Sequence, residues 1–224
     1  MSPSKPARIF IVDDHPLVRE WLANLLRQQP DLVVCGEAED AAKALAAMTK
    51  EAPDVAIVDL SLKTGSGLDL IKDLRVIHPD VAVIVLSMHE EIFYAERALR
   101  AGARGYVMKR ESTGQIIDAI RQVRAGRIYA NPDVLGRLAE RLVGRSSAAR
   151  GTVEGLSDRE LEVFRRLGRG ETTRQVASEL HVSIKTVQAY CSRIKEKLGL
   201  PSGAQLVRAA VRWVEQESSG QPGV

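Results

Sequence analysis

The chain has 224 residues, which exceeds the usual domain length of about 100 to 200 residues and predicts two domains. A hydrophobic fraction of 45%, a charged fraction of 27% and a net charge of +3 are typical of an ordinary globular protein and argue against intrinsic disorder. No apolar run is long enough to span a membrane and the N-terminus has no signal-peptide core, so we expect a cytoplasmic protein with no membrane partner.

Residues 7–125 alternate short β-branched runs with longer amphipathic stretches, the pattern of repeated βα units around a parallel sheet. The strands read as nearly continuous apolar runs, as expected where helices cover both faces of the sheet. We predict an α/β doubly wound fold with a five-stranded parallel sheet, whose strands span residues 8–13, 32–38, 55–59, 81–87 and 105–108.

Helix start signals separate these strands. Pro16 suits the first helical position, where its missing N–H costs nothing, and Ser112 with Gln115 predicts a capping box. A further helix is predicted at residues 133–143, followed by small and polar residues that break all periodicity. We therefore place a first domain at residues 1–128 and a linker containing a helix at residues 129–155.

From residue 156 the strand patterns disappear and four helices with short turns predict a compact all-helical domain at residues 156–216. Residues 217–224 are expected to form a flexible tail, with fraying from Gln216. The expected helix caps are Ser157 with Glu160, Thr173, Ser183, and Ser202 with Gln205.

Polar residues gather at the predicted strand ends, where open parallel sheets bind their ligands. Asp13 and Asp14 end the first strand, Asp59 ends the third, Ser87 ends the fourth, and Lys109 follows the fifth. Three neighbouring carboxylates repel one another unless a cation lies among them, and an all-oxygen ligand set favours Mg²⁺ over softer metals. The pattern therefore predicts a Mg²⁺ site at this edge of the sheet.

On these residues, the segment 7–125 closely resembles the receiver family typified by CheY. The resemblance implies a CheY-like fold in which Asp59 accepts a phosphoryl group from the phosphohistidine of a sensor histidine kinase. It also implies that Asp14 binds Mg²⁺ directly, that Asp13 binds it through water, and that the backbone carbonyl of Ser61 and the Asp59 carboxylate are further ligands.

The same resemblance assigns the phosphoryl-stabilising and switch residues. Lys109 would neutralise charge on the phosphoryl oxygens, Ser87 would donate a hydrogen bond to one of them, and the ring of Tyr106 would move with Ser87. Because such a protein reacts with itself and turns over no external substrate, we expect it not to be an enzyme.

A doubly wound phosphatase or nucleotide-binding protein with solvated acidic strand ends is the alternative for this domain. A haloacid-dehalogenase-type hydrolase requires DxD after its first strand, whereas this chain has DDH, and the first turn lacks the GxGxxG of a dinucleotide-binding protein. The histidines are scattered and are expected at surface or capping positions rather than in catalysis: His15, His78, His89 and His181.

The basic residues concentrate toward the C-terminal domain. Residues 1–130 carry 17 Lys and Arg against 18 Asp and Glu, a net −1, whereas residues 156–215 carry 11 against 7, a net +4. The C-terminal segment LSDRELEVFRRLGRGETTRQVASELHVSIKTVQAYCSRIKEKLGL resembles the LuxR-type helix-turn-helix of NarL/FixJ regulators. The resemblance implies double-stranded DNA as the partner, with the helix at residues 184–198 in the major groove.

Spacing along that helix predicts which face contacts DNA. Val187 and Ile194 lie seven residues apart on the core face. Gln188 can read adenine or contact guanine, while Tyr190 either packs into the core or contacts a phosphate. The opposite face is expected to present Gln188, Ala189, Ser192 and Arg193, and the expected phosphate contacts are Lys185, Thr186, Arg193 and Lys195.

Together these patterns predict a two-component response regulator and transcription factor that is switched by phosphorylation of Asp59. Phosphorylation is expected to favour a homodimer, which places two reading helices on one operator. The alternative is a signalling adaptor whose helical domain binds protein, or a helical domain whose basic face is merely solvated. A solvated face is the expected environment of Arg159, Arg165, Arg166 and Arg169.

Overall fold

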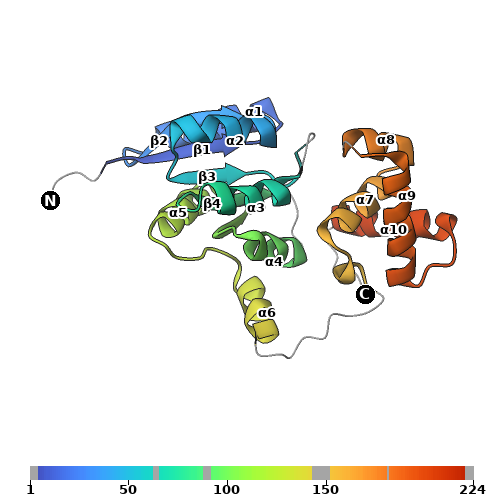
Figure 1. Cartoon of the computed structure of the whole chain (residues 1–224). Coiled ribbons are helices and arrows are strands. Elements are labelled where there is room, and N and C mark those ends of the chain that lie inside the picture. Colours follow the sequence, from blue (N-terminus) through green and yellow to red (C-terminus); the bar gives the residue numbers. More distant parts are fainter. Residues whose placement is uncertain (1–4, 63–65, 88–91, 143–151, 181, 220–224) are drawn as a thin grey trace. The chain divides into compact units, whose positions relative to one another are not determined.

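The computed structural model of the chain describes residues 5–62, 66–87, 92–142, 152–180 and 182–219 (Figure 1). The chain divides into two compact units, Met1–Leu135 and Gly136–Val224. Within the described ranges, no helix combines the length and the apolar character needed to cross a membrane.

The first unit is built on a five-stranded parallel sheet in the order β2-β1-β3-β4-β5. The predicted doubly wound parallel sheet is confirmed, and no predicted strand boundary is wrong by more than one residue. From β1 the chain adds β2 on one side of the sheet and then β3, β4 and β5 on the other side. A crevice is therefore expected beyond the carboxyl ends of β1 and β3, where the direction of strand addition changes. The strands are β1 (Ala7–Val12), β2 (Leu32–Ala38), β3 (Val55–Val58), β4 (Ala82–Ser87) and β5 (Gly105–Met108).

Helices cover both faces of this sheet. Ile9 and Ile11 of β1 belong to a core shared with α1 and α5, and the alternation of side chains turns Phe10 to the opposite face. On that second side, α2 contacts α3 and α3 contacts α4. The helices are α1 (Pro16–Arg27), α2 (Ala41–Glu51), α3 (Gly67–Ile77), α4 (Ile92–Ala101) and α5 (Thr113–Arg124).

The predicted start signals of the first unit are confirmed. Pro16 is the first residue of α1, and Ser112 and Gln115 form both halves of a capping box. The helix predicted at residues 133–143 is α6 (Pro132–Leu142), whose predicted last residue lies outside the described residues. The predicted linker run is described only from residue 152, where Val153–Gly155 form one 3₁₀ turn.

The second unit contains the four predicted helices, α7 (Asp158–Gly168), α8 (Thr173–Glu179), α9 (Ile184–Leu198) and α10 (Gly203–Ser219). The ring of Phe164 on α7 lies 5.7 Å from that of Trp213 on α10, centroid to centroid. These two helices pack so closely that a Cβ atom at Gly168 would overlap the carbonyl oxygen of Ala210. Glycine is therefore required at this crossing.

Two predicted boundaries in this unit are wrong. The cap of α8 is Thr172 rather than Thr173, because only Thr172 is three residues before Gln175 and can complete a capping box with it. The predicted start of the tail, with fraying from Gln216, is also wrong because α10 continues to Ser219, while residues 220–224 lie outside the described residues. No glycine or proline interrupts the chain between Trp213 and Gly220. The caps at Ser157, Ser183 and Ser202 are confirmed.

The solvated face expected for four arginines is also incorrect in part. Arg165 and Arg166 are buried, although Arg169 is exposed. Arg166 donates to Glu162 at 2.8 Å and lies 3.2 Å from a carboxylate oxygen of Glu171. Burial is possible because these carboxylates neutralise the guanidinium, and α7 needs such pairing since α8, α9 and α10 all pack against it.

Candidate functional site

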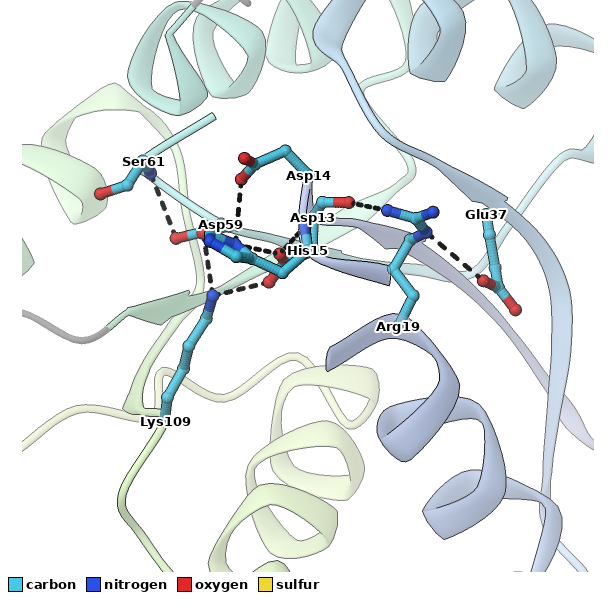
Figure 2. Close-up of polar contacts among 8 residues, drawn as sticks. All are labelled: Asp13, Asp14, His15, Arg19, Glu37, Asp59, Ser61 and Lys109. Atoms are coloured by element: carbon cyan, nitrogen blue, oxygen red, sulfur yellow. Dashed lines mark hydrogen bonds and ion pairs between the residues drawn. The ribbon is translucent and has the colours of Figure 1, made fainter. Parts of the chain in front are cut away.

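The carboxyl ends of β1 and β3 bring three carboxylates together (Figure 2). Asp13 and Asp14 follow β1 and Asp59 follows β3, and all three are at most 9% exposed. One ligand atom from each, together with one from His15, lie within 4.8 Å of one another. The strand ends that the sequence pointed to therefore form one small acidic cluster.

Lys109 connects two of these carboxylates. Its Nζ lies 2.6 Å from an oxygen of Asp13 and 2.8 Å from one of Asp59 (Figure 2). The backbone N–H of Lys109 donates to the carbonyl of Ser87 at 2.8 Å, which places the residue directly beyond β4 and β5. Burial lowers the pKa of Lys109, but the neighbouring carboxylates outweigh this and raise it above 10.5, so the group is an ammonium at neutral pH.

Asp59 has the opposite balance. Burial raises its pKa above 3.8, and the opposing attraction of Lys109 offsets only part of this rise. The backbone N–H of Ser61 donates to the other carboxylate oxygen at 3.1 Å. Three carboxylates facing one ammonium leave an excess of negative charge in a buried place, and this hard oxygen donor set fits a divalent cation.

His15 and Arg19 belong to the cluster, although the sequence did not assign them there. Nδ1 of His15 lies 3.1 Å from Asp13 Oδ1 and 3.2 Å from Asp14 Oδ1. Arg19 Nη1 donates to the backbone carbonyl of Asp13 at 2.6 Å and its Nε lies 3.7 Å from Glu37 (Figure 2). The signal in the sequence is the spacing: His15 directly follows the acidic pair, and Arg19 comes one helical turn later.

The surface position expected for His15 is confirmed, whereas its side chain does not cap a helix. His15 occupies the N-cap position of α1, but its side chain makes no hydrogen bond to the helix because the imidazole is turned toward the carboxylates. Its side chain is nevertheless 55% exposed, as a surface residue would be. His78 ends α3 as its C-cap, whereas His89 and His181 lie outside the described residues.

Ser87 and Tyr106 occupy the neighbouring strands. Ser87 ends β4 and is fully buried, and Tyr106 on β5 is buried to within 6% exposure. In the register of these strands Tyr106 is opposite Val85, two residues before Ser87. Both residues expected to respond to phosphorylation are therefore inside the unit, near the same sheet edge as Asp59.

In the second unit, α9 has a buried and an exposed side. Val187 and Ile194 are fully buried, which confirms the predicted core face. Tyr190, Thr186 and Lys195 are half-buried. The exposed residues of the helix include the predicted base-facing set and one predicted phosphate contact: Gln188, Ala189, Ser192, Arg193 and Lys185.

Three hydroxyls at this surface form hydrogen bonds within α9 or at its amino end. Ser183 caps α9 by accepting the backbone N–H of Thr186 at 3.0 Å, and the two hydroxyls lie 2.8 Å apart. Ser192 donates to the carbonyl of Gln188 at 3.1 Å. The capped amino end of α9 is thus a fixed structural element.

Comparison with protein families assigns both units. The model of the response regulator receiver domain matches residues 9–121, and that of the luxR family of bacterial regulatory proteins matches residues 154–210. The alternatives of a hydrolase or a nucleotide-binding protein for the first unit therefore receive no support from the family that it matches.

Two relatives align with this chain over nearly their whole length. The chain is 35% identical over 216 residues to the DNA-binding transcriptional activator DevR/DosR of Mycobacterium tuberculosis, covering 96% of this chain and 98% of that protein. It is also 35% identical over 200 residues to the transcriptional regulatory protein UhpA of Escherichia coli, covering 89% and 95%.

Solved structures agree. RcsB from Salmonella typhimurium superposes with a TM-score of 0.71 at 27% identity, covering 97% of this chain and all of that one. RcsB from Salmonella enterica serovar Typhimurium bound to a promoter in the presence of the phosphomimetic BeF₃⁻ gives a TM-score of 0.68, also at 27% identity, covering 92% and 98%. These relatives favour DNA over protein as the partner of the helical domain. The chain belongs to the LuxR family of two-component response regulators, with a receiver domain followed by a LuxR-type DNA-binding domain.

Proposed function

We propose that Asp59 is the phosphoryl acceptor of this response regulator and that a sensor histidine kinase is the donor. The observation that carries the proposal is the buried Asp59 carboxylate, held 2.8 Å from the Lys109 ammonium beside two further buried carboxylates. An Asp59 oxygen attacks the phosphorus of the phosphohistidine, the P–N bond breaks, and an acyl phosphate forms. The protein modifies itself in this step, so we class it as a regulator and not as an enzyme.

The pocket residues have distinct roles in this proposal. Lys109 exchanges its contact with Asp59 for one with the transferred phosphoryl oxygens, whose charge it neutralises. The Ser87 hydroxyl donates to a phosphoryl oxygen, and Tyr106 follows the movement of Ser87. Phosphorylation adds about two negative charges, which is an adequate electrostatic cause for such a rearrangement.

Mg²⁺ is the cation we propose for the acidic cluster. Asp13, Asp14 and Asp59 would hold it together with the backbone carbonyl of Ser61, a ligand set made of oxygen only. When bound, Mg²⁺ would supply further positive charge to stabilise the transferring phosphoryl group.

The second part of the proposal concerns DNA. We place the receiver at residues 1–128, the linker at residues 129–155 and the DNA-binding domain from residue 156. Phosphorylation favours a homodimer whose two α9 helices read half-sites about one helical turn, or 34 Å, apart. In α9, base edges are read by Gln188, Ala189 and Ser192, and phosphates are bound by Lys185, Thr186, Arg193 and Lys195.

Labelling with acetyl phosphate tests the acceptor. In the presence of Mg²⁺, intact-protein mass spectrometry should detect one added phosphoryl group on the wild-type chain and none on Asp59→Asn. Asp73→Asn is the matched control, because Asp73 is an exposed carboxylate on α3, and it should be labelled normally. Label retained by Asp59→Asn would place the acceptor elsewhere and overturn the proposal.

A further inference from the structure

We propose that His15 is a direct nitrogen ligand when a divalent first-row transition-metal ion occupies the receiver pocket in place of Mg²⁺, and that it raises the affinity of the pocket for such ions. This inference rests on the metal site proposed above. It adds an imidazole to a donor set that otherwise consists of oxygen atoms.

The distances around His15 are those of neighbouring ligands on one ion. Its Nδ1 lies 3.1 Å from Asp13 Oδ1 and 3.2 Å from Asp14 Oδ1. An octahedral ion with bonds of about 2.1 Å holds adjacent ligand atoms about 3 Å apart. The two separations that involve His15 therefore match those of adjacent ligands, and all the candidate ligand atoms lie within 4.8 Å of one another.

The backbone already holds His15 in this position. Its N–H donates to Asp13 Oδ1 at 2.8 Å, and Arg19 fixes the carbonyl of Asp13 at 2.6 Å. The imidazole makes no capping hydrogen bond to α1, and its side chain is 55% exposed to solvent. Figure 2 shows the imidazole turned toward the carboxylates of Asp13 and Asp14.

The chemistry of the imidazole determines which ions bind more tightly when His15 is a ligand. A metal ligand must offer a lone pair, so the imidazole would bind an ion through Nδ1 and carry a proton only on Nε2. Imidazole binds transition-metal ions strongly, and affinity rises from Mn²⁺ to Co²⁺ and Ni²⁺. Mg²⁺, which prefers oxygen, gains little from the same ligand.

The competing role for His15 is that of a positioning residue, which only donates a hydrogen bond to Asp13 or Asp14. Both roles would reduce metal binding when His15 is replaced, so affinity for one metal does not separate them. A nitrogen bound to the ion and a change in metal preference are signatures that a hydrogen-bond donor does not produce.

Pulsed electron paramagnetic resonance of bound Mn²⁺ on the full chain provides the first readout. The wild-type chain should show the ¹⁴N coupling of a directly bound imidazole, and His15→Asn should lose it. His78→Asn is the control, because His78 lies at the end of α3 and should keep the signal. Circular dichroism establishes that each variant is folded. Mn²⁺ bound to the wild-type chain without ¹⁴N coupling overturns the inference.

Calorimetric titration provides the second readout. His15→Asn should weaken Co²⁺ binding by about tenfold or more while Mg²⁺ affinity changes by no more than about threefold. An equal loss for the two metals overturns the inference in favour of the positioning role. Asp14→Asn distinguishes failure of this inference from failure of the proposed metal site. If Asp14→Asn leaves metal binding unchanged, the proposed metal site is wrong. If metal binding depends on Asp14 but shows no ¹⁴N coupling, the metal site stands and only the role of His15 as a ligand is wrong.

Discussion

Nζ of Lys197, in the last turn of α9, lies 2.6 Å from Oε2 of Glu160 in the first turn of α7. The Glu160 side chain is only 4% exposed, and the same oxygen accepts the backbone N–H of Ser157 at 2.7 Å. One buried carboxylate thus fixes both the start of α7 and the end of the helix that we propose reads DNA.

Lys197→Met should lower the free energy of unfolding of the DNA-binding domain by about 1 to 2 kcal/mol, because it removes one charged hydrogen bond while Lys197 itself is partly solvated. In scanning calorimetry, Lys197→Met should lower the unfolding temperature of this domain and leave that of the receiver unchanged. Lys185→Met, at an exposed position of α9, is the matched control and should change stability little. Equal effects of the two variants would contradict the structural role of Lys197.

The same pair predicts a pH dependence. Burial raises the pKa of Glu160, but the hydrogen bonds from Lys197 and Ser157 outweigh it and hold the pKa below 4.5. A carboxyl with a lowered pKa contributes stability above its unfolded value, and that contribution is lost as the pH falls through the folded value. In thermal melts, the difference in melting temperature between the wild-type chain and Glu160→Gln, which cannot titrate, should therefore become smaller below pH 4.5. A difference that stays constant with pH would refute this linkage.

The contribution of Asp59 to stability should have the opposite pH dependence. Because burial raises its pKa above 3.8, the ionised carboxylate costs stability at neutral pH, and this cost appears as the pH rises through the folded value. Asp59→Asn should therefore stabilise the metal-free receiver at pH 7 by roughly 1 kcal/mol. Differential scanning calorimetry in buffer containing a chelator measures the melting temperatures of the two proteins. A lower melting temperature for the variant under those conditions would show that the Lys109 pair dominates instead.

The sequence was sufficient for the sheet and for the acidic pocket because both follow from order along the chain. The apolar runs end directly at three carboxylates, those of Asp13, Asp14 and Asp59. Because the carboxyl ends of parallel strands lie at one edge of the sheet, these residues come together there. The buried state of Arg166 was not visible, because its partners Glu162 and Glu171 matter only once neighbouring helices exclude water.

The remaining errors have local causes. Two adjacent threonines made the cap of α8 ambiguous, and only the spacing of Thr172 to Gln175 decides it. The direction of the His15 ring depends on the turn between β1 and α1, which no periodicity reports. The fold was thus more predictable than the side-chain orientations within the site.

Substitutions in α9 should separate positioning from specificity. Lys185→Ala should weaken binding to all DNA sequences and reduce the salt slope by about one, because it removes one phosphate contact. Gln188→Ala should cost about 1 to 3 kcal/mol on the preferred operator and less on others. Mobility shifts at several salt concentrations measure both, with Arg212→Ala on the exposed side of α10 as a charge-matched control. If the two effects were exchanged, the assigned roles would be wrong.

The hydrogen bond from the Ser192 hydroxyl to the carbonyl of Gln188 restricts what Ser192 can recognise. A hydroxyl has one proton, and this one is already donated within the helix, so only oxygen lone pairs face outward. In the major groove those lone pairs match the amino groups of adenine and cytosine, whereas guanine O6 and N7 and thymine O4 are themselves acceptors. Within the proposed interface, Ser192 would therefore favour a base that presents an amino group.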